Sequence, residues 1–269
     1  MYIGVDIGGT HTRVAIGESG EYSDKKDFPT KGLSETLKEI KESISSFNNK
    51  NLKSVGVSVA GPVNSKKNLL YHPPNLPESW QEKELAKLFS EKLGIPTIVD
   101  HDASVAALGE AKYGSGKGKN PVLYYTVSTG IGSGLVVDGK IFHGIYNPEA
   151  GQQILNDKGD SLESLSSGKA LKEKTGKEPK DVEGTDLWEK SMEWVAIGIA
   201  NSILHFSPEI VVVGGGMTKH GDIFFNPVKK YISKHLTIIP QVPIVPSSLG
   251  QDNGVIGALE LAKQVDLNG

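Results

Sequence analysis

The chain has 269 residues, 37% of them hydrophobic, which is enough to bury one large core or two ordinary ones. Its formal net charge is −3 with acidic and basic residues mixed along the chain, which argues against a nucleic-acid partner or a polybasic membrane anchor. It has no cysteine, which excludes disulfides and thiolate zinc sites, and it has neither a membrane-spanning apolar run nor a signal peptide, so we expect a cytoplasmic protein.

The first half of the chain alternates predicted strands and helices. An apolar strand over residues 2–7 runs into Gly8-Gly9-Thr10, and a second strand follows over 13–16. This pattern predicts a β-hairpin, whereas a P-loop or a dinucleotide-binding turn would open a helix. Further along, the spacing of apolar residues predicts a helix over 34–47, a strand over 55–59, an irregular segment over 64–80 and a helix over 82–93.

The second half repeats this organisation after a glycine- and lysine-rich segment at 113–119, which we interpret as a boundary or hinge. A strand, a Gly/Thr turn and another strand again follow one another. The expected elements are strands over 122–127, 135–137, 140–142 and 210–213 and helices near 161–175, 186–206, 225–235 and 255–264. Two similar halves around a hinge suggest an internal duplication of two α/β domains.

Three ionisable residues, Asp100, His101 and Asp102, lie between a predicted strand at 97–99 and a predicted helix that begins at Asp102. In open α/β sheets, ligands bind at the carboxyl ends of strands, so this junction is a candidate catalytic site. Aspartate is also a common helix cap, so a purely structural role for Asp100 or Asp102 fits the same pattern.

The glycine-rich turns DIGGT (6–10) and STGIG (128–132) share a chemistry. Consecutive glycines allow backbone N–H groups to converge on an anion, and Asp6 could hold a hydrated Mg²⁺ beside bound phosphates. Each turn alone is equally consistent with an ordinary hairpin turn. GSGKGK (114–119) is not a P-loop because it follows a helix and lacks Ser or Thr after its lysine.

Six segments in order resemble the ROK family (repressors, open reading frames, kinases) of sugar kinases, within the actin–hexokinase–Hsp70 superfamily. They are DIGGTHTR, AGPV, PNLPESW, TIVDHDASVAALGE, STGIGSGLVVDGK and PEIVVVGGG. The resemblance implies an α/β fold with two ribonuclease-H-like (actin-like ATPase) domains around an interdomain cleft. The N-terminal domain would span 1–114 and the C-terminal domain 115–269, with the last helix packing back on the N-terminal domain.

The same resemblance implies roles for individual residues. Asp102 matches the catalytic aspartate, which would act as general base for a sugar hydroxyl. The positions that match nucleotide-binding residues are Asp6, Gly8, Gly9, Thr10 and Thr12 in the first phosphate loop, Thr129, Gly130 and Gly132 in the second, and Gly214, Gly215 and Gly216 beside the adenosine. Those that match sugar-lining residues are Gly61, Asn75, Glu149 and Glu163. The implied cofactors are ATP and Mg²⁺, with Asp6 holding the metal through water.

Two departures from the family pattern concern the sugar side of the site. His101 stands where the family usually has Asn, and Gln152 replaces a His that often ligates zinc. The usual cysteine-rich loop is absent, so we expect a zinc-free member. His101 and Gln152 would then contact the C1/C2 side of the sugar, although His101 could instead be a spacer whose ring stays out of the site.

The expected activity is ATP-dependent phosphorylation of the 6-hydroxyl of a hexose, glucose or a close aldohexose first. Kinases of N-acetylmannosamine or another N-acetylhexosamine are the near alternative. A sugar-responsive regulator is the expectation that fits less well, because no helix-turn-helix precedes the first phosphate-loop strand. A non-catalytic sugar-binding or ATPase module fits less well because the matched base and both phosphate loops are intact. The expected partner is a hexose, with no nucleic acid and no membrane, and family habit suggests a homodimer or homotetramer.

Overall fold

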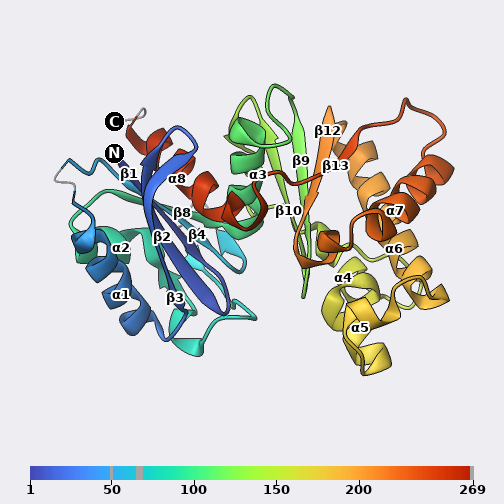
Figure 1. Cartoon of the computed structure of the whole chain (residues 1–269), viewed down its shortest axis with the longest axis horizontal. Helices are drawn as coiled ribbons and strands as arrows, with labels where there is room; N and C mark the ends of the chain where they lie inside the picture. Colours follow the sequence, from blue (N-terminus) through green and yellow to red (C-terminus); the bar gives the residue numbers. More distant parts are fainter. Residues whose placement is uncertain (49–50, 65–68, 267–269) are drawn as a thin grey trace.

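The chain forms two five-stranded sheets that lie next to each other, with helices between them and on their outer faces (Figure 1). The structure is a computed structural model and describes residues 1–48, 51–64 and 69–266. The two mixed sheets confirm the expected α/β class, because each combines antiparallel hairpin strands with parallel strands.

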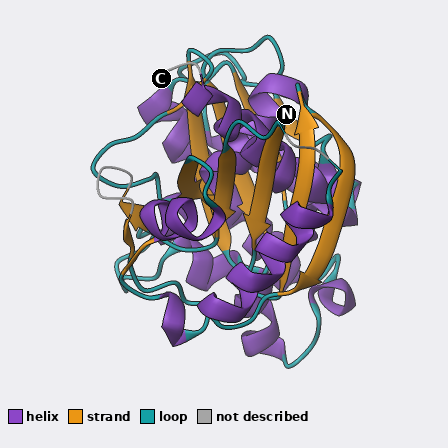
Figure 2. Ribbon diagram, turned by 90° about the vertical axis from the view of Figure 1, so that its left-hand side faces the viewer, coloured by secondary structure: helices purple, strands orange, loops and turns teal. Residues whose placement is uncertain are grey.

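The N-terminal sheet has the strand order β3-β2-β1-β4-β8. Its strands are β1 (Tyr2–Ile7), β2 (His11–Glu18), β3 (Glu21–Pro29), β4 (Val55–Val59) and β8 (Thr97–His101). β1 and β2 form the expected hairpin, and β4 and β8 run parallel to β1. Helices α1 (Leu33–Ser46) and α2 (Leu85–Leu93) pack on its outer face, in front of the strands in Figure 2. β4 is buried along its whole length because helices cover both faces of this part of the sheet.

The C-terminal sheet repeats this topology in the order β11-β10-β9-β12-β13. Its strands are β9 (Val122–Val127), β10 (Ile131–Val137), β11 (Lys140–Ile141), β12 (Ile210–Gly214) and β13 (Ile244–Pro246). Helices α4 (Leu162–Ser166), α5 (Gly168–Thr175), α6 (Asp186–Phe206) and α7 (Asp222–His235) lie on its outer side (Figure 1). The apolar stripe of α6 is buried as expected, from Trp188 to Ile203.

Two helices occupy the space between the sheets. α3 (Asp102–Tyr113) packs against β9 and β10, and α8 (Asn253–Asp266) returns to pack on β1 and β4. Glycines allow these close approaches: a Cβ on Gly257 would lie 1.9 Å from the carbonyl oxygen of Val105 on α3. We retain the division at residues 114 and 115 as a proposal, with α8 joined to the N-terminal half.

The chain passes between the two halves twice, after α3 and before α8, and one buried carboxylate binds both crossings. Glu110, near the end of α3, is fully buried. It accepts hydrogen bonds from the backbone N–H of Ser115 (2.9 Å) in the first crossing and of Leu249 (3.1 Å) in the second. The Ser247 hydroxyl also donates to it. These donors satisfy a charge that would otherwise be costly to bury.

Two local expectations were wrong, and one strand was not expected. β3 was not predicted, because its sequence EYSDKKDFP is almost wholly polar and it lies at the sheet edge. The helix expected over 161–175 is two helices, since Ser167 ends α4 and caps α5 by accepting from the Ala170 N–H (3.1 Å). The irregular segment over 64–80 contributes to a small sheet of β5 (Val63–Asn64), β6 (Leu69–Leu70) and β7 (Lys83–Glu84), although residues 65–68 lie outside the described residues.

Candidate active site

A cavity of about 600 Å³ lies between the two halves and is lined by residues from both. All seven residues expected to bind the sugar line it, namely Gly61, Asn75, His101, Asp102, Glu149, Gln152 and Glu163. So do the glycines of both phosphate turns, namely Gly8, Gly9, Gly130 and Gly132, together with Thr129. The cavity therefore joins a carboxylate-rich pocket to two possible anion-binding turns.

Asp102 is the first residue of α3, directly after β8, and its side chain is 42% exposed. Its Oδ1 atom accepts a hydrogen bond from the backbone N–H of Ala103 (2.7 Å) and lies 3.1 Å from Nε2 of His101. Among the described residues, Oδ2 has no hydrogen-bond partner. One carboxylate oxygen is thus held in place while the other is free to accept a proton.

His101 is buried, with only 5% of its surface exposed, yet its ring reaches the cavity. Nε2 lies 3.1 Å from Asp102 Oδ1 and 3.7 Å from Glu149 Oε1. Nδ1 is buried and has no hydrogen-bond partner among the described residues. The ring therefore presents Nε2 to both carboxylates, which does not fit the spacer alternative.

Two further acidic residues, Glu149 and Glu163, line the same cavity. Burial raises the pKa of Glu149, and the negative charges of Asp102 and Glu163 raise it further. Glu163 accepts hydrogen bonds from the backbone N–H of Ile131 (2.7 Å) and from Nε2 of Gln152 (3.3 Å). Carboxylates suit a sugar site because each accepts several hydroxyl hydrogen bonds.

Asp6 lies at the end of β1 and lines a neighbouring cavity of about 560 Å³ together with Gly214, Gly215 and Gly216. It accepts hydrogen bonds from Ser58 Oγ (2.8 Å) and from Nη1 of Arg13 (3.4 Å). Burial raises its pKa, and the charge of Asp102 acts in the same direction. A largely buried carboxylate whose charge is only partly balanced by Arg13, beside a glycine turn, fits Mg²⁺, which binds through one or two carboxylates, water and phosphates.

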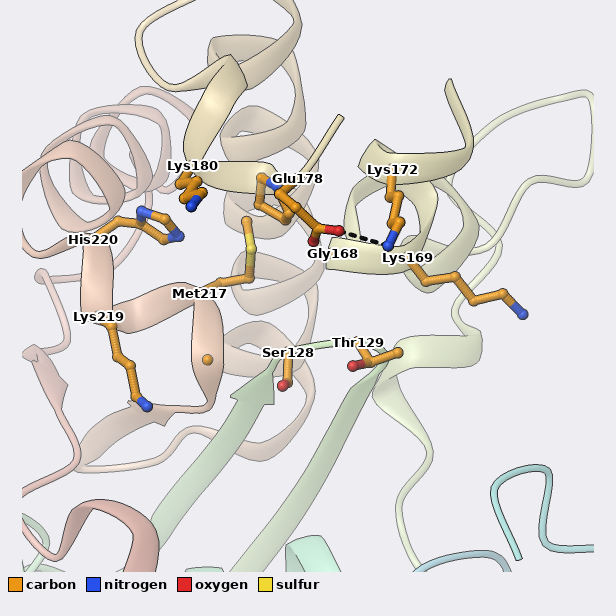
Figure 3. A pocket seen from close by; sticks show the side chains of 12 residues that line it. Ser128, Thr129, Gly168, Lys169, Lys172, Glu178, Lys180, Met217, Lys219 and His220 are labelled. Atoms are coloured by element: carbon orange, nitrogen blue, oxygen red, sulfur yellow. Dashed lines mark ion pairs between the residues drawn. The ribbon is translucent and has the colours of Figure 1, made fainter. Parts of the chain in front are cut away.

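A third cavity, of about 630 Å³, opens beside the second phosphate turn (Figure 3). Ser128 and Thr129 line one side and Met217 another. Pro179 also lines it, together with four lysines: Lys169, Lys172, Lys180 and Lys219. Lys172 pairs with Glu178 at 2.5 Å. Apolar surface surrounded by positive charge suits a nucleotide, whose base is apolar and whose phosphates are anionic.

Gly215 shows why glycine is required beside this cavity. Its φ is +97°, and a Cβ would lie 2.4 Å from the carbonyl oxygen of Val127. Any other residue would therefore separate the end of β12 from β9 and displace the turn that connects two of the cavities.

Comparison with known proteins agrees with this geometry. Residues 2–265 match the family model described as the ROK family. The chain belongs to the ROK family. It is 27% identical to a glucokinase of Streptomyces coelicolor, over 99% of this chain and 98% of that protein, and 27% identical to a fructokinase of Pediococcus pentosaceus, over 96% of each.

The fold is also that of solved ROK kinases, which have the two-domain actin-like ATPase architecture. A ROK family glucokinase from Streptomyces griseus, solved in complex with glucose and AMPPNP, superimposes with a TM-score of 0.82. The two sequences are 24% identical, and the match covers 98% of this chain and 99% of that one.

Two residues expected in the first phosphate loop, Thr10 and Thr12, do not line the three cavities described above. Thr12 is fully buried, and its Oγ1 lies 2.9 Å from Oγ1 of Thr30. Thr10 is exposed. Met217 and His72 were not among the expected site residues, yet Met217 lines the third cavity and His72 lines the cavity that contains Asp102. Met217 directly follows the expected Gly216, and His72 lies two residues before the segment PNLPESW; these positions were the available signal.

Over residues 1–48, 51–64 and 69–266, no group of three or more His, Asp or Glu side chains is arranged to hold a metal ion. In the same part of the chain, every helix is too short or too polar to cross a lipid bilayer.

Proposed function

We propose that this ROK protein transfers the γ-phosphoryl group of ATP to the 6-hydroxyl of a hexose, with glucose or a close aldohexose as the first choice. The observation that carries the proposal is the free Oδ2 of Asp102, in a cavity that also reaches both glycine turns. A carboxylate in this position can accept the hydroxyl proton as the oxygen attacks phosphorus.

The remaining residues position the reactants, which is most of what phosphoryl transfer requires. Glu149, Glu163 and Gln152 would hold sugar hydroxyls, and the backbone N–H groups of the two glycine turns would hold the phosphates. Asp6 would hold Mg²⁺ through water, and the metal when bound would neutralise charge on the transferred phosphoryl group. The base and ribose would occupy the cavity beside Met217 and Gly216.

We also propose that sugar binding draws the two halves together and excludes water that would otherwise hydrolyse ATP. The cavity fits this proposal because its wall comes from both halves: Asp102 from one and Glu149 from the other. Small-angle scattering should show compaction when glucose is added, and an unchanged radius of gyration would refute closure.

Two other classes of sugar substrate are the alternatives. Gln152 and His101 together could accept an N-acetylhexosamine such as N-acetylmannosamine, since both offer hydrogen-bonding groups near the carboxylates. Fructose is a second alternative, because one relative is a fructokinase. A sugar-responsive regulator is the function from another class.

A coupled assay with MgATP and a panel of glucose, mannose, fructose, glucosamine, N-acetylglucosamine and N-acetylmannosamine tests the proposal. We expect the highest kcat/KM for glucose or mannose. If no sugar phosphate forms from any of the six, the kinase proposal fails. Light scattering on the same preparation should find the homodimer or homotetramer that we propose, and a monomer would refute that part.

A further inference from the structure

Asp100 is almost fully buried at the end of β8, two residues before Asp102, and three donors bind it. The backbone N–H of His101 donates to it at 2.7 Å. Nδ2 of Asn147 lies 2.9 Å from its Oδ1 atom, and Nε2 of His143 lies 2.6 Å from its Oδ2 atom. Asp100 therefore does not cap α3; it connects the N-terminal half to two residues of the C-terminal half.

The two partners belong to a segment, residues 142–148, that leads directly to Glu149. The end of this segment is attached to the C-terminal sheet through Ser133: its hydroxyl donates to the carbonyl of Pro148 (3.1 Å) and accepts from the N–H of Ala150 (3.1 Å). Asn147 also donates to Ser104 in the first turn of α3 (3.1 Å). Glu149 thus lies between an anchor on its own sheet and an anchor on the helix that carries Asp102.

Few other contacts restrain residues 142–148. Ile145 and Tyr146 are 62% and 56% exposed, and the ring of Tyr146 has a tilted contact with Tyr71 at a centroid distance of 6.1 Å. Because apolar packing is weak here, the hydrogen bonds to Asp100 are the main restraint on the segment. The hydrogen bond to Asp100 also raises the pKa of His143, which favours the charged and stronger form of the pair.

We propose that Asp100 is a positioning residue for sugar binding: by holding His143 and Asn147 it fixes the segment that presents Glu149 opposite Asp102. The inference rests on the proposed function, because it assigns Asp100 to the sugar half of that site. It predicts an asymmetric effect, since the segment leads to Glu149, which lines the proposed sugar cavity and neither of the other two cavities.

The test compares Asp100→Asn, His143→Leu and His143→Gln with the wild type and with the control His205→Gln, an exposed histidine at the end of α6. We expect Asp100→Asn and His143→Leu to raise the KM for sugar, and its calorimetric Kd, about tenfold or more. The KM for MgATP should change less than about twofold, and His143→Gln, which keeps an N–H donor, should recover most of the affinity. The double variant Asp100→Asn/His143→Leu should bind sugar as tightly as the single variant with the lower affinity, since both substitutions remove the same interaction.

An unchanged sugar KM and Kd in Asp100→Asn and His143→Leu would overturn the inference, and so would an equal loss for sugar and MgATP. If Asp100→Asn does not fold, the partly exposed His143 still gives the answer through its two variants. A wild type that binds glucose without phosphorylating it would refute the proposed function alone, because the calorimetric comparison would still decide the role of Asp100. A wild type that binds none of the six sugars would refute both.

Discussion

Replacing Asp102 with Asn removes the proposed base while changing little else. The Oδ1 atom of Asp102 accepts from the Ala103 N–H and lies beside His101 Nε2, and an Asn oxygen can accept from the same groups. The Asn Nδ2 group would then stand where the free Oδ2 stands, and it cannot accept a proton. The fold and the orientation of the side chain should therefore survive the substitution.

The magnitude follows from what is lost. General-base catalysis contributes about 10²–10⁴ in rate, which corresponds to about 3–5 kcal/mol of activation free energy. We expect kcat to fall by that factor and the calorimetric Kd for the sugar to change less than about threefold, because the neighbouring acceptors of Glu149 and Glu163 are untouched. Comparing kcat with the sugar Kd thus separates the contribution of Asp102 to the transition state from its contribution to sugar binding.

The assay is formation of sugar phosphate at saturating MgATP and sugar, with Asp24→Asn as the control because Asp24 is exposed on the edge strand β3. If Asp102→Asn retains more than about a tenth of the turnover, Asp102 is not the base. If kcat and sugar binding are lost together, the residue binds substrate and the reasoning about its free oxygen is wrong.

Three further outcomes are expected. Since the pKa of Glu149 is raised, kcat/KM for sugar should begin to fall at a higher pH on the acid side than it would for an ordinary carboxylate. Glu149→Gln should lack this fall in profiles from about pH 5 to 8, and an identical fall in the variant would contradict the assignment. Burial raises the pKa of Asp6, so the contribution of this residue to stability is present below the ordinary value of 3.8 and is lost as pH rises through the raised pKa. At neutral pH, Asp6→Asn should therefore melt at or above the wild-type Tm, and MgATP should no longer raise the Tm of the variant. A lower Tm for Asp6→Asn would count against the argument. Gly257→Ala should lower the free energy of unfolding in urea by about 1–3 kcal/mol, because its Cβ meets the Val105 carbonyl, while Gly32→Ala, with ordinary contacts, should change it little.

The sequence predicted those elements whose apolar residues follow a regular period. β1 and β4 have such periods because helices cover them, and the stripe of α6 because it packs into the core of the C-terminal half. β3 has none: its residues face solvent at the sheet edge, so only backbone pairing with β2 defines it. Local propensity cannot reveal a strand that depends on its neighbour.

The sequence likewise predicted one part of the candidate site and not another. The sugar-side residues carried over from the ROK resemblance line one cavity, whereas Asp6 and Gly214, Gly215 and Gly216 line a neighbouring one. Thr12 shows the limit of such a motif: it follows the loop within the strand β2, where alternation turns its side chain inward. The pairing of Asp100 with His143 joins residues 43 positions apart on different halves, which no local pattern reports.

The hydrogen bonds of Glu110 hold one end of α3, so a rotation of the helix about that end would move the other end. Both chain crossings are bound at one end of this helix, and Asp102 is at the other. Asp102 lies eight residues before Glu110, which at 1.5 Å per residue is about 12 Å along the helix axis, so a rotation of about 5° about the Glu110 end would move Asp102 by about 1 Å. That displacement is about a third of the length of a hydrogen bond, so a small rotation at Glu110 would decide whether Oδ2 reaches a substrate hydroxyl.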